Sequence, residues 1–213
     1  MTFIPGIYSI FKPKGITSHD VIDKIRRLSG IQRVGHAGTL DPLASGVLVV
    51  AVGREFTKQL DSLMKTDKEY LAEITFGKTS TTDDAEGEKT EREVAHISTE
   101  KEVQEVLAHW VGEVDQLPPI YSAIKIQGRP AHRRVRQGET VELQPRQVVI
   151  FTIDLIKYVW PLLQIKVKCG KGVYIRSLAR DIGEELSVGG YMSDLVRTRV
   201  GDFTIEDAKK IED

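Results

Sequence analysis

The sequence of 213 residues has one cysteine, no long apolar run and a net charge of only -1. Because Cys169 has no second cysteine to pair with, an internal disulfide is excluded and a reducing compartment is the simplest setting. No stretch approaches the roughly 18 consecutive apolar residues that a membrane-spanning helix needs. The N-terminus also lacks the basic leader and the small-residue cleavage site of a secretory signal. We therefore expect a cytoplasmic protein that does not bind membranes.

Further absences exclude several kinds of chemistry. The histidines are scattered along the chain and none has the spacing of metal ligands, so we expect no metal ion. The phosphate-binding pattern GxxxxGK[ST] and the nucleophile pattern GxSxG do not occur, and no GxGxxG lies between a strand and a helix. The remaining composition is that of a globular protein, with 40% apolar and 29% charged residues.

The small net charge conceals a strong segregation of charge along the chain. Residues 1–36 hold six basic and two acidic residues, residues 117–147 again hold six and two, and residues 166–180 hold five basic residues and no acidic one. The acidic residues gather in segments 81–116 and 181–213. Any one basic run can simply be a solvated face, but all three adjoin glycine-containing motifs, which favours a polyanionic partner.

Hydrophobic periodicity predicts one α+β domain over residues 1–213, built on a mixed or antiparallel sheet with helices interspersed. The composition of residues 33–46 predicts a long loop, and the polar, acidic residues 77–93 predict an exposed excursion. Residues 120–140 remain open between a loop, a hairpin and a helix, although their first part alternates as a strand. The predicted strands are 6–11, 47–52, 69–76, 120–126, 147–156 and 162–168.

Helices are predicted from capping boxes and apolar stripes. The capping-box pairs are Thr17 with Asp20 and Thr99 with Glu102. We expect the helices that follow them to end at Gly30 and Gly112. A short amphipathic helix is expected around residues 56–64, and a longer one over residues 173–186.

The loop HAGTLDPLASG is the most unusual stretch of the sequence. Its single carboxylate, Asp41, lies among small residues, and Pro42 restricts Asp41 to extended conformations. A carboxylate on a loop whose glycines let the backbone approach a ligand can be a nucleophile or a general base. An Asx-turn before proline is the commoner role of an Asp-Pro pair and stays open as the alternative.

A second stretch, CGKGVYIRSLARDIG over residues 169–183, places Arg176 in the first turn of the predicted helix. An arginine there can pair with a carboxylate or a phosphate, or it can be an ordinary surface residue of a basic helix. Tyr70, Tyr121 and Tyr174 lie near basic or glycine-containing segments and could stack on bases, although core packing is the more frequent role of a tyrosine.

Together these motifs resemble those of the TruB-type tRNA pseudouridine synthases over nearly the whole chain. In the order of that family, the chain contains KPKGITSHD (12–20), GHAGTLDPLASGVLVVAVGREFTK (35–58), KEYLAEITFG (68–77), YSAIKIQG (121–128), CGKGVYIRSLARDIG (169–183) and LVRTRVGDF (195–203). The match is closer to the bacterial branch than to the guide-RNA-dependent archaeal and eukaryotic relatives. The resemblance implies a pseudouridine-synthase fold and no cofactor.

The resemblance also implies the reaction. Such enzymes isomerise uridine to pseudouridine in the T-arm of tRNA, at tRNA position 55, by flipping the nucleotide, breaking the glycosidic bond and rejoining the base through C5. Asp41 matches the essential aspartate, either as nucleophile at C1′ or as the base that takes the C2′ proton. Arg176 matches the arginine that pairs with this aspartate and favours its ionised form. Tyr70 matches the tyrosine stacked on the target base, a candidate for later proton removal.

Further positions match the substrate pocket of that family. Leu195 matches the apolar residue beneath the base and Tyr174 a neighbouring pocket aromatic. His36 matches the histidine that helps to hold the flipped nucleotide, and Lys12 belongs to the motif that buttresses the pocket. Asp84, in the TxDxxG pattern of residues 82–87, matches a carboxylate that reaches the same arginine.

Two departures from the family pattern concern RNA binding. Family members usually continue into a C-terminal RNA-binding PUA domain, whereas this sequence stops at Asp213, so we expect no PUA domain and weaker tRNA affinity. The stretch 128–139 is more basic than usual, and extra arginines there could compensate. The expected RNA-binding side chains are Lys171, Arg129, Arg133, Arg134 and Arg136.

We expect the chain to act on the T-arm stem-loop as a monomer, without guide RNA. The rival interpretation is an RNA-binding folding helper that needs no catalysis. The pair of Asp41 and Arg176 discriminates between the two interpretations, because a protein that only binds RNA has no need of it.

Overall fold

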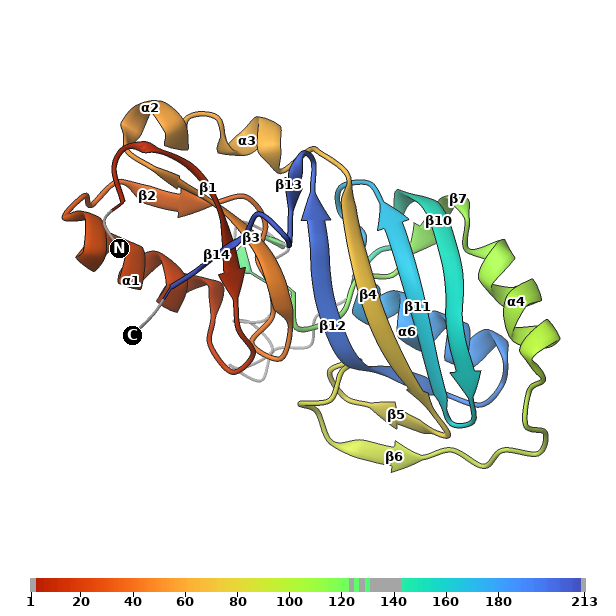
Figure 1. Cartoon of the computed structure of the whole chain (residues 1–213). Coiled ribbons are helices and arrows are strands. Elements are labelled where there is room, and N and C mark those ends of the chain that lie inside the picture. Colours follow the sequence, from red (N-terminus) through yellow and green to blue (C-terminus); the bar gives the residue numbers. More distant parts are fainter. Residues whose placement is uncertain (1–2, 123–124, 127–128, 131–142, 212–213) are drawn as a thin grey trace. The chain divides into compact units, whose positions relative to one another are not determined.

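The computed structural model describes residues 3–122, 125–126, 129–130 and 143–211 (Figure 1). The chain divides into two compact units, which are described separately. Unit 1 comprises Met1–Leu71, Lys166–Lys171 and Asp194–Asp213, and unit 2 comprises Ala72–Ile165 and Gly172–Ser193. Strands β4 (Lys68–Phe76), β11 (Leu162–Cys169) and β12 (Gly190–Val200) contribute residues to both units.

The described part of unit 1 contains three helices and a set of sheet strands. The helices are α1 (Ser18–Ser29), α2 (Arg54–Thr57) and α3 (Leu60–Leu63). Its own strands are β1 (Gly6–Lys12), β2 (Val34–His36), β3 (Ser45–Val52), β13 (Phe203–Thr204) and β14 (Lys209–Lys210). The strand order in this unit is β14–β1–β3–β12–β4–β11, with β2 paired to β3 and β13 to β12. Since β1 and β3 are antiparallel while β3 and β12 are parallel, the sheet is mixed.

Helix α1 forms where the capping signal predicts it. The Thr17 side chain accepts from the Asp20 backbone N–H, and the Asp20 carboxylate accepts from the Thr17 backbone N–H, so the predicted capping box is confirmed. Gly30 ends the helix at φ 68°, in the left-handed region that favours glycine. The buried face of α1 packs on β1 and β3, which fixes the direction in which the following loop leaves the helix.

Strand β3 is buried along its whole length, as the continuous apolar run predicts. Alternate residues of a strand face opposite sides of the sheet. Leu48 and Val50 accordingly belong to a core cluster with α1, whereas Val47 and Val49 pack in a second cluster with Val200. Apolar side chains of this size each contribute about 1.5–3 kcal/mol when fully buried, so β3 is a rigid support for the loop that precedes it.

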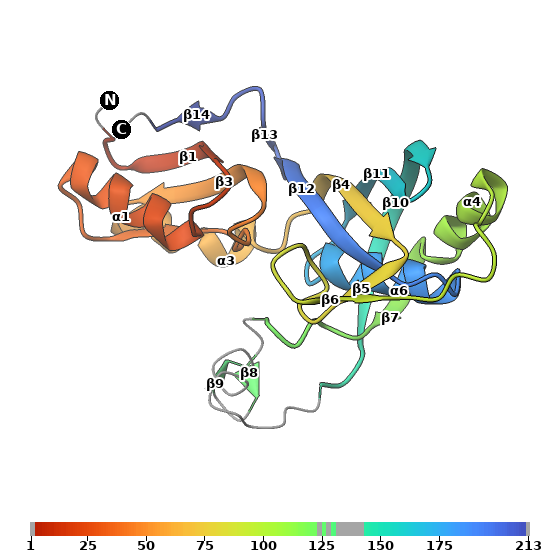
Figure 2. The same cartoon turned by 90° about the horizontal axis from the view of Figure 1, so that it is seen from below.

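Within the residues that the structure describes, unit 2 contains two further helices and the rest of the sheet (Figure 2). The helices are α4 (Glu100–His109) and α6 (Ile175–Glu185). The strands are β5 (Lys78–Ser80), β6 (Lys89–Glu91), β7 (Gly112–Gln116), β8 (Lys125–Ile126), β9 (Arg129–Pro130) and β10 (Arg146–Val159). The order in this unit is β12–β4–β11–β10–β7, and α6 lies against one face of these strands.

The predicted α+β class with a mixed sheet is confirmed, whereas several local predictions are wrong. Residues 33–46 are not all loop, because residues 34–36 pair with β3 as β2. The single short helix expected around residues 56–64 is two separate helices, α2 and α3. Strand β12 was not predicted at all, because charged and apolar residues mix along it.

Unit 2 departs from the sequence expectations in three places. Helix α4 has the predicted capping box but ends at His109, with Trp110 as its C-cap, and Gly112 instead begins β7. Of the strand expected over residues 120–126, the structure describes only residues 125–126 as extended pairing. The excursion 77–93 contains the hairpin β5–β6, and its Asp84 is buried at 3% exposure. Among the described residues, none of the helices is long and apolar enough to cross a membrane.

Candidate active site

The Asp41 loop, residues 37–44, connects β2 to β3 in unit 1 and has no regular secondary structure. The Ala44 backbone N–H donates to the Asp41 carbonyl oxygen at 3.1 Å, which closes a tight turn around Pro42. Asp41 itself is partly buried. The loop is held in place by three side chains from other parts of the unit, namely Lys12, Ser18 and Arg197.

Lys12 lies at the end of β1 with no exposed surface. Its ammonium donates to the carbonyl oxygens of Pro13 at 2.9 Å, Ile16 at 2.7 Å and Pro42 at 3.4 Å. A buried charge is costly unless hydrogen bonds replace its hydration, and the three carbonyls do this here. The Pro42 carbonyl also accepts from the Gly15 N–H at 2.8 Å, so the turn beside Asp41 is tied to the end of β1.

Ser18 fixes the residue before Asp41. Its hydroxyl accepts from the Leu40 N–H at 2.9 Å and donates to the Leu40 carbonyl at 3.0 Å. Both backbone groups of Leu40 are therefore satisfied by one buried side chain from the first turn of α1. The capping box that sets the start of α1 thereby also sets the position of the Asp41 loop.

Arg197 on β12 holds the first part of the loop and is 1% exposed. Its guanidinium donates to the carbonyl oxygens of Gly38 at 3.0 Å, Thr39 at 3.4 Å and Val47 at 2.7 Å. Arg197 also lies opposite Gly46 in the parallel register of β3 and β12. Gly46 has a φ of +108°, and a Cβ there would collide with the Arg197 carbonyl oxygen, so only glycine fits.

Tyr70 on β4 is 7% exposed and lies close to both Arg197 and Asp41. Burial raises the pKa of the Tyr70 hydroxyl above its usual value of 10.0, the Arg197 charge lowers that pKa, and the Asp41 carboxylate raises it. The net direction is upward, so the hydroxyl is protonated at neutral pH. Unit 1 thus brings the predicted catalytic carboxylate and the predicted stacking ring together.

Two more predicted pocket residues lie on the strands of unit 1. His36 ends β2, and its Nδ1 is a buried atom without a hydrogen-bond partner among the described residues. Burial, followed by the charges of Arg197 and His19, lowers the pKa of His36, so its ring is neutral at pH 7. Leu195 on β12 is 6% exposed, two residues before Arg197 and so on the same face of the strand.

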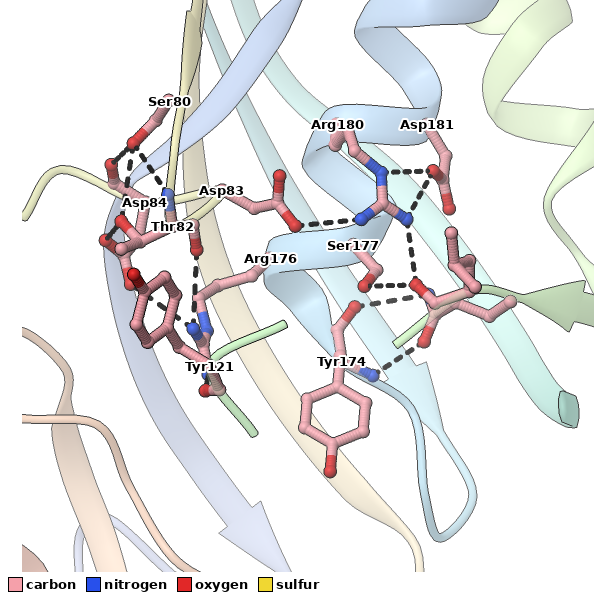
Figure 3. A network of polar contacts seen from close by, with 12 residues as sticks. Ser80, Thr82, Asp83, Asp84, Tyr121, Tyr174, Arg176, Ser177, Arg180 and Asp181 are labelled. Carbon is pink, nitrogen blue, oxygen red and sulfur yellow. Dashed lines mark hydrogen bonds and ion pairs between the residues drawn. The ribbon is translucent and has the colours of Figure 1, made fainter. Parts of the chain in front are cut away.

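Arg176, Asp84 and Tyr174 belong to a network of polar contacts in unit 2 (Figure 3). Arg176, in the first turn of α6, is 6% exposed. Its guanidinium lies 3.6 Å from the Asp84 carboxylate and donates to the carbonyl oxygens of Thr82 at 3.3 Å and Tyr121 at 3.0 Å. A buried arginine with this set of acceptors has a fixed orientation. The predicted pairing of Arg176 with Asp41 joins the two units and stays a prediction.

The Asp84 carboxylate is itself held in place by hydrogen-bond donors. One carboxylate oxygen accepts from the Thr82 hydroxyl and from the Glu86 N–H at 3.0 Å, while the other faces Arg176. The Ser80 hydroxyl donates to the Asp84 carbonyl at 2.6 Å. The TxDxxG turn therefore holds the buried Asp84 carboxylate in a fixed position. The predicted exposed excursion is wrong at this residue.

Tyr174 precedes α6, and its backbone is clamped by one side chain. The Tyr174 N–H donates to the Gln116 side-chain oxygen at 2.8 Å, and the Gln116 side-chain nitrogen donates to the Tyr174 carbonyl at 3.1 Å. The clamp orients the start of the helix that carries Arg176.

Several cations of the basic segments form ion pairs with acidic side chains among the described residues. Lys14 pairs with Asp194 at 2.6 Å, and Lys166 pairs with Glu69 at 3.1 Å. The counts of basic residues by segment therefore overstate the positive charge that is available to RNA. Acidic residues from distant segments pair with these two lysines. Lys171, in the turn before α6, is exposed. Of the predicted RNA-binding arginines, Arg129 has only its backbone described, on β9, and Arg133, Arg134 and Arg136 lie outside the described residues.

Sequence reasoning missed Ser18 and Arg197, which hold the Asp41 loop. A signal for Arg197 existed, since it shares a strand face with Leu195 in LVRTRVGDF. No comparable pattern pointed to Ser18, whose partner Leu40 is 22 residues away. Within the part of the chain that the structure describes, no group of three His, Cys, Asp or Glu side chains could hold a metal ion.

Comparisons with known proteins give a consistent result. Residues 26–175 match the model of the TruB family pseudouridylate synthase (N terminal domain), and residues 176–213 match that of the tRNA pseudouridylate synthase B C-terminal domain. A tRNA pseudouridine synthase B from Caldanaerobacter subterraneus subsp. tengcongensis is 47% identical over 211 residues, covering 99% of this chain and 74% of the relative. One from Thermobifida fusca is 47% identical over 216 residues, covering 98% and 73%.

Solved structures are similar at lower identity. A chain of a Cbf5–Nop10–Gar1 complex has a TM-score of 0.75 at 30% identity, over 97% of this chain and 52% of that chain. A chain of an H/ACA RNP bound to a substrate RNA containing 2′-deoxyuridine has a TM-score of 0.72 at 27% identity, over 96% and 50%. The present chain thus spans about half the length of these solved chains.

The raised pKa of Tyr70 predicts that this side chain is a phenol, not a phenolate, throughout the neutral range. We expect the difference between the tyrosinate absorbance titrations of the wild type and Tyr70→Phe to appear only above about pH 10. A difference titration with its midpoint below pH 9 would contradict the environment described for Tyr70. Tyr191→Phe serves as the control, because Tyr191 is less buried and lies outside the Asp41 loop region.

Proposed function

The chain belongs to the TruB family of pseudouridylate synthases, and we propose that its substrate is the T-arm of tRNA, where it converts uridine to pseudouridine at tRNA position 55. As a member of that family it is an isomerase. The bond between N1 of the base and C1′ of the ribose breaks, a bond between C5 and C1′ forms, and the proton on C5 is replaced by one on N1. No group is gained or lost, which agrees with our expectation that no cofactor takes part.

The observation that carries the proposal is that buried side chains hold the loop around Asp41 in place. Three buried side chains hold the loop around it, and Tyr70 lies beside it. Fixed placement of a reacting group lowers the entropic part of a barrier. Asp41 acts on the ribose of the flipped nucleotide, whether by attack on C1′ or by removal of the C2′ proton. Both routes need the carboxylate in one position relative to the sugar.

The buried ring of Tyr70 and the buried side chain of Leu195 provide the site for the flipped base. Taking a uridine out of its stack costs a few kcal/mol, and stacking on an aromatic ring offsets roughly 1–3 kcal/mol of this. Because Tyr70 is protonated at neutral pH, it serves first as a stacking surface and hydrogen-bond donor. Removal of the C5 proton by Tyr70 would require its ionisation, which burial opposes.

Arg176 supplies the positive charge of the site. Its guanidinium is fixed by Asp84 and by the carbonyls of Thr82 and Tyr121. Such a fixed guanidinium pairs with a carboxylate in a defined geometry. We propose that Arg176 orients Asp41 in the complex with RNA.

The proposal extends to how the chain works as a whole. We propose that residues 1–213 act as one catalytic domain, since β4, β11 and β12 each supply residues to both units. Identity of 47% to bacterial relatives, against 30% to the Cbf5 chain, supports action without guide RNA. The monomeric state and the cytoplasmic location stay predictions.

Asp41→Asn should abolish pseudouridine formation in a T-arm stem-loop while leaving RNA binding nearly unchanged, because the amide keeps the shape of the carboxylate but cannot act as nucleophile or base. Pseudouridine is measured by mass spectrometry after digestion, and binding by titration of labelled RNA. Asp61→Asn, an exposed carboxylate on α3, is the matched control and should retain activity. Conversion by Asp41→Asn at the wild-type rate would show that the assigned chemistry is wrong.

Lys171→Ala should lower the slope of log Kd for the T-arm against log salt concentration by about 0.9, because one phosphate contact is lost. Its kcat should stay unchanged. Lys101→Ala removes the same charge from α4, where the lysine is 84% exposed in an acidic segment, and should leave the slope as it is. Replacing Arg133, Arg134 and Arg136 together should lower the slope further. Equal slopes for Lys171→Ala and the wild type would exclude Lys171 as a phosphate ligand.

A further inference from the structure

Two arginines of α6 form ion pairs with two consecutive carboxylates of the TxDxxG turn (Figure 3). Arg176 and Arg180 are four residues apart and so lie on one face of the helix. Asp84 faces Arg176 at 3.6 Å, and Asp83 faces Arg180 at 2.8 Å. The Asp83 and Arg180 side chains are 15% and 22% exposed, so this second ion pair is mostly removed from solvent.

The backbone conformation at Asp83 makes the double contact possible. In an extended chain, successive side chains point in opposite directions, so adjacent carboxylates cannot both face one helix. Asp83 has a φ of +60°, in the left-handed region that non-glycine residues rarely occupy. Its carbonyl oxygen accepts from the Met192 N–H at 3.0 Å, which holds this conformation. Strain of this kind persists only where the surroundings impose it.

Arg180 also anchors the second segment that contacts Arg176. Its guanidinium donates to the Leu117 carbonyl at 2.8 Å, four residues before Tyr121. Arg176 therefore takes acceptors from two segments, the turn with Thr82 and Asp84 and the segment that reaches Tyr121. Arg180 contacts both segments. Its contact with Asp181 lies within α6 and holds no other segment.

We propose that Asp83 and Arg180 form a positioning pair for the isomerisation, which fixes the acceptors around Arg176. The inference rests on the proposed function of Arg176. Neither residue touches the substrate. Without the pair, the turn and the segment to Tyr121 each lose one of their ties to α6, and Arg176 samples several orientations. The chemical step is slowed, because the reacting geometry forms less often. Binding of tRNA depends on other contacts and is retained.

The test is a double-mutant cycle on Asp83→Asn and Arg180→Gln in the full chain. Steady-state kcat and KM are measured on a T-arm stem-loop, well below the melting temperature of the least stable variant. Each single variant should lower kcat by about tenfold and change KM by less than about twofold. The double variant should lose no more than either single one, because the two residues act as a unit. Arg180→Lys, which keeps the charge, should recover most of kcat.

Asp181→Asn is the matched control, since it removes a carboxylate from Arg180 without touching the turn. A positioning role predicts wild-type kcat for Asp181→Asn, even if its melting temperature falls. If Asp83→Asn has wild-type kcat, if only KM changes, or if Asp181→Asn loses as much kcat, the inference is overturned. Should Asp83→Asn not fold, Asp83→Glu is assessed by the same criteria. A wild type that forms no pseudouridine would instead refute the proposed function itself.

Discussion

The position of the candidate catalytic carboxylate depends on one buried charge, the ammonium of Lys12. It has no exposed surface, and its hydrogen bonds go to the carbonyl oxygens of Pro13, Ile16 and Pro42. Because a buried ammonium without such acceptors is very costly, the three carbonyls have little freedom to move away from it. A loop rich in small residues, which has no helix or strand bonds of its own, is thereby given one conformation. Ser18 and Arg197 fix the residues on either side in the same way.

Each unit holds some of the residues that we propose for the reaction. Unit 1 holds Asp41, Tyr70 and Leu195, which would act on the ribose and the base. Unit 2 holds Arg176 with its carboxylate, on a helix whose first turn is clamped from two sides. The same kind of interaction occurs in both units. In each, a buried cationic side chain donates hydrogen bonds to backbone carbonyls of segments that are far apart in the sequence. In both units these contacts hold chain that has no helix or strand bonds of its own, at positions that we propose for the reaction.

Much of the fold could be predicted from local patterns, and the failures share a cause. Capping boxes located α1 and α4, and the continuous apolar run located β3, because these signals depend on neighbouring residues. Strand β12 was missed because its buried arginine breaks the apolar alternation. The burial of Asp84 was missed because its partner lies 92 positions further along the chain. For the site, residue patterns alone suggested Asp41 and Arg176 and offered three tyrosines as stacking candidates, and the family resemblance supplied their roles and the other residues.

The most direct test of this account is the steady-state kcat of the Lys12→Met variant on a T-arm stem-loop. The variant keeps an unbranched side chain of nearly the same length but removes the ammonium that donates to the three carbonyls. If the Lys12 ammonium sets the position of Asp41, kcat should fall by more than about tenfold while RNA binding persists. Lys14→Met, which loses an exposed lysine paired with Asp194, should keep the wild-type kcat. A folded Lys12→Met variant with wild-type kcat would contradict the account.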